Sequence, residues 1–216
     1  MTILQPTSSF PDLSLARQSK VHGRHLPCLE VSGGIYHLTF HLADSIPLTE
    51  LAAWRELRQE LRERALRESR ELTEDERRLL RACHDERIER FLSCGCGSCI
   101  LRDSRAADEV ERTLLFGNGR DYALHEYTIM PNHLHVIAGG FSDGGSLRRV
   151  LAQWKSITAH RINTALGRQG DVWMKDAYSH FIRSSAEYQV QMSYVWMNPE
   201  SAGLKEGFRR RRFVER

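Results

Sequence analysis

The chain has 216 residues, of which 41% are hydrophobic and 27% are charged, the balance of a globular protein with a buried core. This composition excludes a collagen-like or disordered chain, and no run approaches the roughly 18 uninterrupted apolar residues that a membrane-spanning helix needs. The first thirty residues lack a basic segment followed by an apolar one, so the sequence predicts no secretory signal, no membrane association and a cytoplasmic location.

The net charge of +3 hides an uneven distribution, because residues 44–120 carry −2 whereas residues 121–216 carry +4. Of the 31 basic residues, 27 are arginine, which binds phosphate through planar, bidentate contacts. The basic excess therefore indicates a nucleic-acid partner, and the alternative is a solvated surface of ion pairs.

The two ends of the chain are predicted to lie outside a single domain at residues 31–205. Residues 1–30 contain three of the six prolines and are predicted to form an irregular N-terminal arm. Residues 206–216 are predicted to form a basic C-terminal tail, in which Arg209–Arg212 lie between two phenylalanines. That pattern suits phosphate contacts with base stacking, and the alternative is a disordered basic tail.

The first half of the domain is predicted to contain one strand and three helices. Alternation predicts a strand at residues 35–42, with Ile35, His37, Thr39 and His41 on one face. Residues 48–92 are charged and helical, and the capping box Thr73-Glu-Asp-Glu76 begins the second of two helices there. A third helix follows at residues 104–116, so residues 48–116 form a helical elaboration of the domain.

The second half is predicted to add a β-hairpin, a helix, a strand and a last helix. The hairpin joins residues 122–129 to residues 133–139, and Ser146 caps a helix that runs to Leu166. A strand at residues 177–182 precedes a capped helix that should stop near Pro199. The order predicts an α+β, ferredoxin-like βαββαβ sandwich with a helical insertion and a C-terminal helix.

His133 and His135 are the first candidate functional residues. Alternate residues of a strand point to the same face, so the two imidazoles should project together from Cα atoms about 7 Å apart. Two converging imidazoles can bind a metal ion, and the alternative is a pair of surface histidines.

Tyr194 and Asn198 are the second pair, because residues four apart share one face of a helix. An asparagine oxygen suits hard cations such as Mg²⁺ or Mn²⁺. A tyrosine beside such an ion could attack a phosphodiester and form a covalent phosphotyrosine. Tyr178 and Tyr188 have no comparable ligand four residues later, and the alternative for Tyr194 itself is a packing role.

These motifs together resemble one known family. The segment Met130-Pro-Asn-His-Leu-His-Val-Ile137 is similar to the histidine-hydrophobic-histidine signature of the single-tyrosine HUH transposases. Residues 194–204 resemble the tyrosine motif of their REP-associated tyrosine transposase branch, as do residues 171–183 and the opening at residues 34–44. The resemblance spans about residues 30–205, and its strongest motifs follow residue 120.

The resemblance implies a ferredoxin-like fold and a metal-dependent transposase that cleaves and rejoins single-stranded DNA beside hairpins. It implies that Tyr194 is the catalytic nucleophile and takes the 5′-phosphate. It further implies that His133, His135 and Asn198 hold Mg²⁺ or Mn²⁺. The family includes monomers and homodimers, so Tyr194 could serve its own histidines or those of a partner.

Two further groups of residues are candidates for binding. DNA contacts are predicted for basic residues of the second half, namely Arg148, Arg149, Lys155, Arg161, Arg183, Arg209, Arg210, Arg211 and Arg212. Cys94, Cys96 and Cys99, joined by Cys83 or His84, could hold zinc, although the CxCxxC spacing is not that of a standard zinc knuckle.

Two other functions compete with the transposase. The first is a domesticated DNA-hairpin-binding protein that uses the same basic surface without transposition. The second is a metal-dependent phosphoesterase that uses the two histidines without a covalent intermediate. A Tyr194→Phe variant separates them, because the transposase alone should lose strand cleavage while it keeps DNA binding.

Overall fold

The centre of the molecule is a five-stranded antiparallel sheet. The computed structural model describes residues 19–22, 27–31, 33–141, 146–175 and 177–213, and the side chains from residue 31 onward except those of residues 77 and 81–87. Across the sheet the strands follow the order β6 (Tyr178–Ile182), β3 (Ile35–His41), β5 (His133–Gly139), β4 (Ala123–Ile129) and β7 (Arg209–Arg212). Every neighbouring pair is antiparallel. The protein is therefore an α+β protein, as the sequence predicts.

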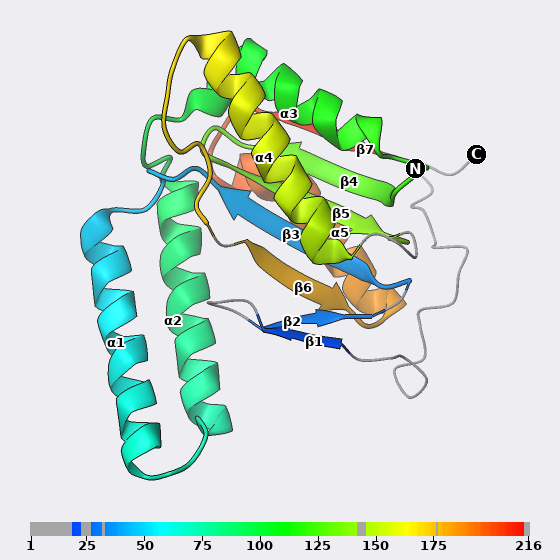
Figure 1. Cartoon of the computed structure of the whole chain (residues 1–216). Coiled ribbons are helices and arrows are strands. Elements are labelled where there is room, and N and C mark those ends of the chain that lie inside the picture. The colour runs from blue at the N-terminus through cyan, green and yellow to red at the C-terminus, as the bar shows by residue number, and fades with distance from the viewer. Residues whose placement is uncertain (1–18, 23–26, 32, 142–145, 176, 214–216) are drawn as a thin grey trace.

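Helices cover both faces of this sheet (Figure 1). The helices α3 (Ser104–Phe116) and α4 (Leu147–Leu166) pack on one face, against a large core that includes Tyr36, Leu38 and Phe40. The helix α5 (Ser185–Ser201) packs on the other face, where the smaller core contains Ile35, Ile137, Ile182, Tyr188, Met192 and Val195. Because neighbouring residues of a strand point to opposite faces, the histidines of β3 and β5 lie on the α5 face.

The predicted helical elaboration at residues 48–116 divides into two parts. Its helices α1 (Leu48–Arg67) and α2 (Glu74–Ser93) form a hairpin that projects beside the sheet (Figure 1). A short 3₁₀ turn, η1 (Ile100–Arg102), then leads on to α3, which packs on the sheet. The predicted capping box begins α2, because Thr73 and Glu76 each accept a hydrogen bond from the other's backbone N–H. No helix in the described ranges is both long enough and apolar enough to cross a membrane.

Helix α5 ends at Ser201, near Pro199 as the sequence predicts, but Pro199 itself lies inside the helix. Proline has no N–H, so the carbonyl of Val195 loses its helical donor. The hydroxyl of Thr128 on β4 donates to that carbonyl at 2.8 Å. The carbonyl of Val195 thus exchanges a helical hydrogen bond for one from the sheet. This contact ties α5 to β4 and offsets the hydrogen bond that Pro199 removes from the helix.

Strands occur at two places where the sequence predicts irregular chain. Within the predicted N-terminal arm, β1 (Ser19–His22) pairs with β2 (Pro27–Glu30), while residues 1–18 lie outside the described part. Within the predicted tail, β7 extends the main sheet beside β4. Backbone hydrogen bonds make both pairs, and side-chain patterns do not reveal them in the N-terminal arm or in the run of arginines.

Strand β7 is held by ion pairs that are buried to different extents. Arg212 donates to Glu126, whose side chain is fully buried, and also to the backbone oxygen of Met192 on α5. Arg210 pairs at 2.8 Å with Glu200, which is 41% exposed. Burial raises the pKa of Glu126 to about 7 despite the neighbouring guanidinium. Arg212 is therefore the cation on which this buried carboxyl group depends.

We expect Arg212→Ala to lower the free energy of unfolding by about 3–5 kcal/mol, because it leaves a buried carboxylate without a partner. The matched change Arg210→Ala breaks an ion pair with half-exposed Glu200 and a hydrogen bond to the carbonyl of Trp196, but it leaves no buried charge and should cost only about 1–2 kcal/mol. Urea unfolding measured at pH 8 compares the two variants. Equal losses, or a double variant Glu126→Leu/Arg212→Leu no more stable than Arg212→Ala, would contradict the expectation.

Candidate functional site

His133 and His135 face each other on the α5 side of the sheet. They lie on β5 opposite His41 and Thr39 of β3. Both side chains are buried, and their two Nε2 atoms are 3.1 Å apart. The chemistry of this pair depends on which nitrogen of each ring carries the proton.

Asn132 determines the protonated nitrogen of His133. The amide nitrogen of Asn132 donates to the carbonyl oxygen of Cys96 at 3.0 Å, which orients the amide. The amide oxygen then lies 2.8 Å from Nδ1 of His133. An oxygen there can only accept, so the neutral ring of His133 carries its proton on Nδ1 and a lone pair on Nε2.

A second chain of hydrogen bonds determines the protonated nitrogen of His135. The Nδ1 atom of His37 lies 2.8 Å from the side-chain oxygen of Gln191 on α5, so this nitrogen donates. The Nε2 atom of His37 therefore accepts from Nδ1 of His135, at 3.0 Å. Thr39 contacts the same Nδ1 atom at 2.9 Å. His135 is consequently left with a lone pair on Nε2.

Burial keeps these rings neutral. It lowers the pKa of His37 from 6.5 to about 4 and that of His133 to about 3, and it holds the pKa of His135 well below 6.5. Two unprotonated Nε2 atoms thus point at each other at 3.1 Å, an arrangement that a shared cation would stabilise. The donor set therefore fits a metal ion.

Asn198 and Tyr194 approach the same histidine pair from α5. Asn198 is buried, and its side chain interacts with His133. The ring of Tyr194 packs edge-on against His135, with ring centroids 5.4 Å apart. Tyr194 is nevertheless 37% exposed. The structure brings together all four residues of the two sequence motifs, within one chain.

The two rival tyrosines, Tyr188 and Tyr178, have other neighbours than Tyr194 has. Tyr188 is fully buried and its hydroxyl lies 2.9 Å from Nδ1 of His125. Tyr178 lies on the edge strand β6, and its ring centroid is 6.4 Å from that of His37. Tyr178 therefore lies beside His37, whereas Tyr188 lies beside His125.

Four further residues of the site had no role assigned from the sequence, namely His37, Gln191, Asn132 and Glu89. Two of them carried a signal: Asn132 lies within the motif at residues 130–137, and His37 alternates with Thr39 and His41 on the face that β3 shares with His135. Glu89 of α2 accepts a hydrogen bond from the hydroxyl of Tyr194, across 105 residues of sequence. Within the described ranges no three His, Cys, Asp or Glu side chains converge on a metal position, so the candidate donor set is two imidazoles and an amide.

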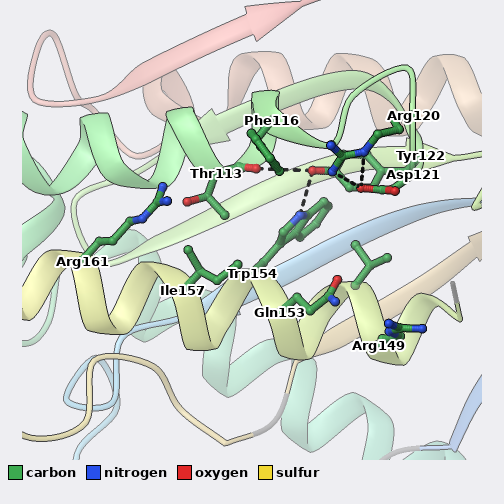
Figure 2. A pocket seen from close by; sticks show the side chains of 12 residues that line it. Thr113, Phe116, Arg120, Asp121, Tyr122, Arg149, Gln153, Trp154, Ile157 and Arg161 are labelled. Atoms are coloured by element: carbon green, nitrogen blue, oxygen red, sulfur yellow. Dashed lines mark hydrogen bonds and ion pairs between the residues drawn. The ribbon is translucent and has the colours of Figure 1, made fainter.

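The predicted DNA-binding residues of α4 lie on the opposite face of the sheet from the histidines. Arg149 and Arg161 line a cavity of about 500 Å³ between α3 and α4, whose floor includes Trp154 and Tyr122 (Figure 2). Arg161 also lies 3.8 Å from Glu109. Arg148 is exposed, whereas the ammonium of Lys155 donates to the carbonyl oxygen of Met174 at 2.8 Å. The α4 residues therefore form a surface separate from the tyrosine.

The remaining predicted DNA-binding residues lie at the ends of strands. Arg183 is exposed directly after β6. In β7, Arg209 pairs with Asp108 and Glu111, and Arg210 and Arg212 pair with Glu200 and Glu126. The guanidinium of Arg211 lies over the ring of Phe213, 5.0 Å from its centroid. Most of this run therefore supports the fold, and its role in DNA binding stays a prediction.

The cysteine-rich loop after α2 contacts the turn before β5, the strand that carries His133 and His135. Cys94, Cys96 and Cys99 are free thiols, and the zinc site stays a prediction because the side chains of Cys83 and His84 lie outside the described residues. The loop contributes a backbone carbonyl to the site, because the oxygen of Cys96 accepts the hydrogen bond that orients Asn132. Gly97 has φ +90° and passes so close to Asp44 that a Cβ atom would lie 2.6 Å from its carbonyl oxygen.

Comparisons with known proteins found one similar structure. No family model matches the chain, and no curated protein matches it. The structure is similar to that of a REP-associated tyrosine transposase bound to a REP hairpin, with a TM-score of 0.41 and 14% sequence identity. The match covers 86% of this chain and 74% of the other. Functional conclusions therefore depend on the residues of this chain.

The half-buried His125 predicts a loss of stability in mild acid. Burial lowers the pKa of His125 from 6.5 to about 4, so below pH 6.5 the unfolded chain binds a proton that the folded chain excludes. The contribution of His125 to the free energy of unfolding is complete above pH 6.5 and falls by up to about 3 kcal/mol as the pH drops to 4.

Chemical denaturation between pH 4 and 8 measures this effect. His125→Gln should flatten the pH dependence, because glutamine does not titrate. The control His160→Gln makes the same substitution at an exposed position on α4. Parallel curves for His125→Gln and the unsubstituted protein would show that His125 is not excluded from protonation in the folded state.

Proposed function

We propose that this protein is a transposase that cleaves and rejoins single-stranded DNA beside hairpins, through a covalent bond between Tyr194 and a 5′-phosphate. The observation that carries the proposal is the exposed phenol of Tyr194, packed against a buried pair of neutral histidines whose Nε2 lone pairs converge. A nucleophile beside a cation-binding donor set is what phosphodiester transfer requires.

The metal in this proposal is Mg²⁺ or Mn²⁺, held by His133, His135 and Asn198. Two neutral imidazoles and one amide oxygen suit Mn²⁺ and leave room for oxygen ligands from a substrate. When bound, the ion would neutralise charge on the scissile phosphate. Asn132 and His37 act through the ligands, since each fixes the proton on the far nitrogen of a metal-binding ring.

Tyr194 supplies the covalent step. Its hydroxyl oxygen attacks phosphorus, the P–O3′ bond breaks, and the strand ends as a free 3′-hydroxyl and a 5′-phosphotyrosine. A 3′-hydroxyl, from this strand or another, can attack the phosphotyrosine and reseal DNA. One phosphodiester bond replaces another in each step, so no external energy source is needed. Tyr194 contacts histidines of its own chain, which supports a site complete within one chain of a monomer or a homodimer.

The substrate and fold class in this proposal come from the resemblance of the two motifs to the REP-associated tyrosine transposases. The chain order of a strand, helices, two strands, a helix and a strand supports the ferredoxin-like assignment, with β7 added at one edge. The arginines around the α3–α4 cavity would contact the phosphates of a hairpin stem. The single strand beside the stem would reach Tyr194 on the other face.

A covalent-adduct assay tests this function. The protein is incubated with Mn²⁺ and labelled single-stranded DNA that carries hairpins from repeats flanking its own gene, and the products are separated on a denaturing gel. We expect a slowly migrating band that disappears in Tyr194→Phe, because the attacking oxygen is gone. His135→Ala should reduce the band by at least about 100-fold, given the share of such reactions that electrostatic stabilisation supplies.

The matched control is Tyr178→Phe, which removes another hydroxyl near the site and should keep the band. Hairpin binding measured without cleavage shows whether Tyr194→Phe is still folded and bound to DNA. Binding without any adduct in the unsubstituted protein would favour the DNA-hairpin-binding function. Cleavage that survives Tyr194→Phe would favour a phosphoesterase.

Metal binding can be tested without DNA. We expect His133→Ala to abolish Mn²⁺ binding and Asn132→Ala to weaken it by about 10–100-fold, because Asn132 only orients the ligand ring. Titration calorimetry, or electron paramagnetic resonance of free Mn²⁺, measures both. Each variant is first compared with the unsubstituted protein in thermal unfolding without metal. Equal Mn²⁺ affinity in all three proteins would contradict the assigned ligands.

A further inference from the structure

We propose that Glu89, on the helical hairpin, is the proton acceptor for Tyr194 during strand cleavage. The proposal rests on the proposed function, since it assigns a role in the same reaction. It also gives residues 48–99 a purpose, namely to bring a carboxylate into contact with the phenol of Tyr194.

The contact joins two elements that are remote in sequence. The hydroxyl of Tyr194 donates to a carboxylate oxygen of Glu89, which lies on the last turns of α2. Both side chains are exposed to solvent, so a phosphate group can approach the phenol oxygen from outside. A base in direct hydrogen-bond contact with the attacking hydroxyl satisfies the geometric condition for general-base catalysis.

The imidazoles beside the phenol are already committed to other partners. The ring of His37 lies 5.6 Å from that of Tyr194, but its Nε2 atom accepts from His135 and its Nδ1 atom donates to Gln191. His135 donates through Nδ1, and its Nε2 atom faces His133. Both nitrogens of His37 are therefore occupied, and the one lone pair left on His135 is the pair assigned to the proposed metal ion.

The position of Glu89 is set by the anchored end of α2. Leu92, three residues later, is buried, and the backbone N–H of Cys96 donates to the carbonyl of Phe91. The carbonyl of Cys96 in turn accepts from Asn132, the residue that orients His133.

Two further hydrogen bonds tie the loop after α2 to the sheet. The N–H of Ser98 donates to the carboxylate of Asp44 at 2.8 Å, just beyond β3. The N–H of Leu101 donates to the carbonyl of Pro131 at 3.1 Å, in the turn before β5. The loop that positions a histidine therefore also anchors the helix that carries Glu89.

The proton balance of the step is complete. As the Oη–P bond of Tyr194 forms, its O–H bond breaks and the proton passes to the carboxylate of Glu89. The P–O3′ bond breaks, and the leaving oxygen takes up one proton, from Glu89 or from water, to become the 3′-hydroxyl. In rejoining, protonated Glu89 returns a proton to the departing phenol oxygen, as microscopic reversibility requires.

The test replaces Glu89 by glutamine, which keeps the size and the hydrogen-bonding oxygen but is not a base. We expect Glu89→Gln to slow adduct formation at least 100-fold, within the range of general-base contributions, while the dissociation constants for hairpin DNA and Mn²⁺ stay unchanged. Glu60→Gln is the control, because it removes the same charge from an exposed position on α1 and should leave the rate as it is.

A second measurement separates proton transfer from positioning. Fluorinated tyrosine at position 194 ionises at lower pH and needs less help from a base, so the loss caused by Glu89→Gln should shrink markedly at pH 8. An unchanged or increased rate in Glu89→Gln would overturn the proposal, as would an equal loss with tyrosine and fluorotyrosine. Absence of any Tyr194-dependent adduct in the unsubstituted protein would instead overturn the proposed function itself.

Discussion

Two buried imidazole nitrogens with opposed lone pairs are the feature on which the rest of the α5 face depends. The Nε2 atoms of His133 and His135 lie 3.1 Å apart, and neither carries a proton because Asn132 and His37 occupy the other nitrogen of each ring. Burial prevents protonation from relieving the repulsion. A donor pair held in this way is preorganised for a cation, at a cost that the packing of the surrounding sheet must offset.

That packing depends on how α5 is attached. Pro199 removes a helical hydrogen bond, and Thr128 of β4 takes the carbonyl that is left. Arg212 of β7 bridges buried Glu126 to the carbonyl of Met192, so the last strand ties the helix and the sheet together. Tyr194 and Asn198 thus sit on a helix that is fastened along its length, and their distances to the histidines follow from these contacts.

The helical hairpin and the cysteine-rich loop also position residues of the candidate site. One amide, that of Asn132, joins the Cys96 carbonyl to His133, while α2 carries Glu89 to Tyr194. The basic surface of α4 lies on the other side of the sheet. The candidate site and the arginines of α4 therefore lie on opposite faces of the sheet. In the proposed function, the stem of a DNA hairpin would contact one face and its single-stranded flank the other.

The sequence by itself determined the α+β class, most element boundaries and the pairing of His133 with His135 and of Tyr194 with Asn198, because alternation, helical spacing and capping boxes are local properties. Tertiary structure decided the rest. The protonation of His135 depends on His37 and Gln191, 98 and 56 residues away, and Tyr194 meets Glu89 across 105 residues. Pro199 within α5 and the arginines of β7 needed partners on β4, which no local pattern could reveal.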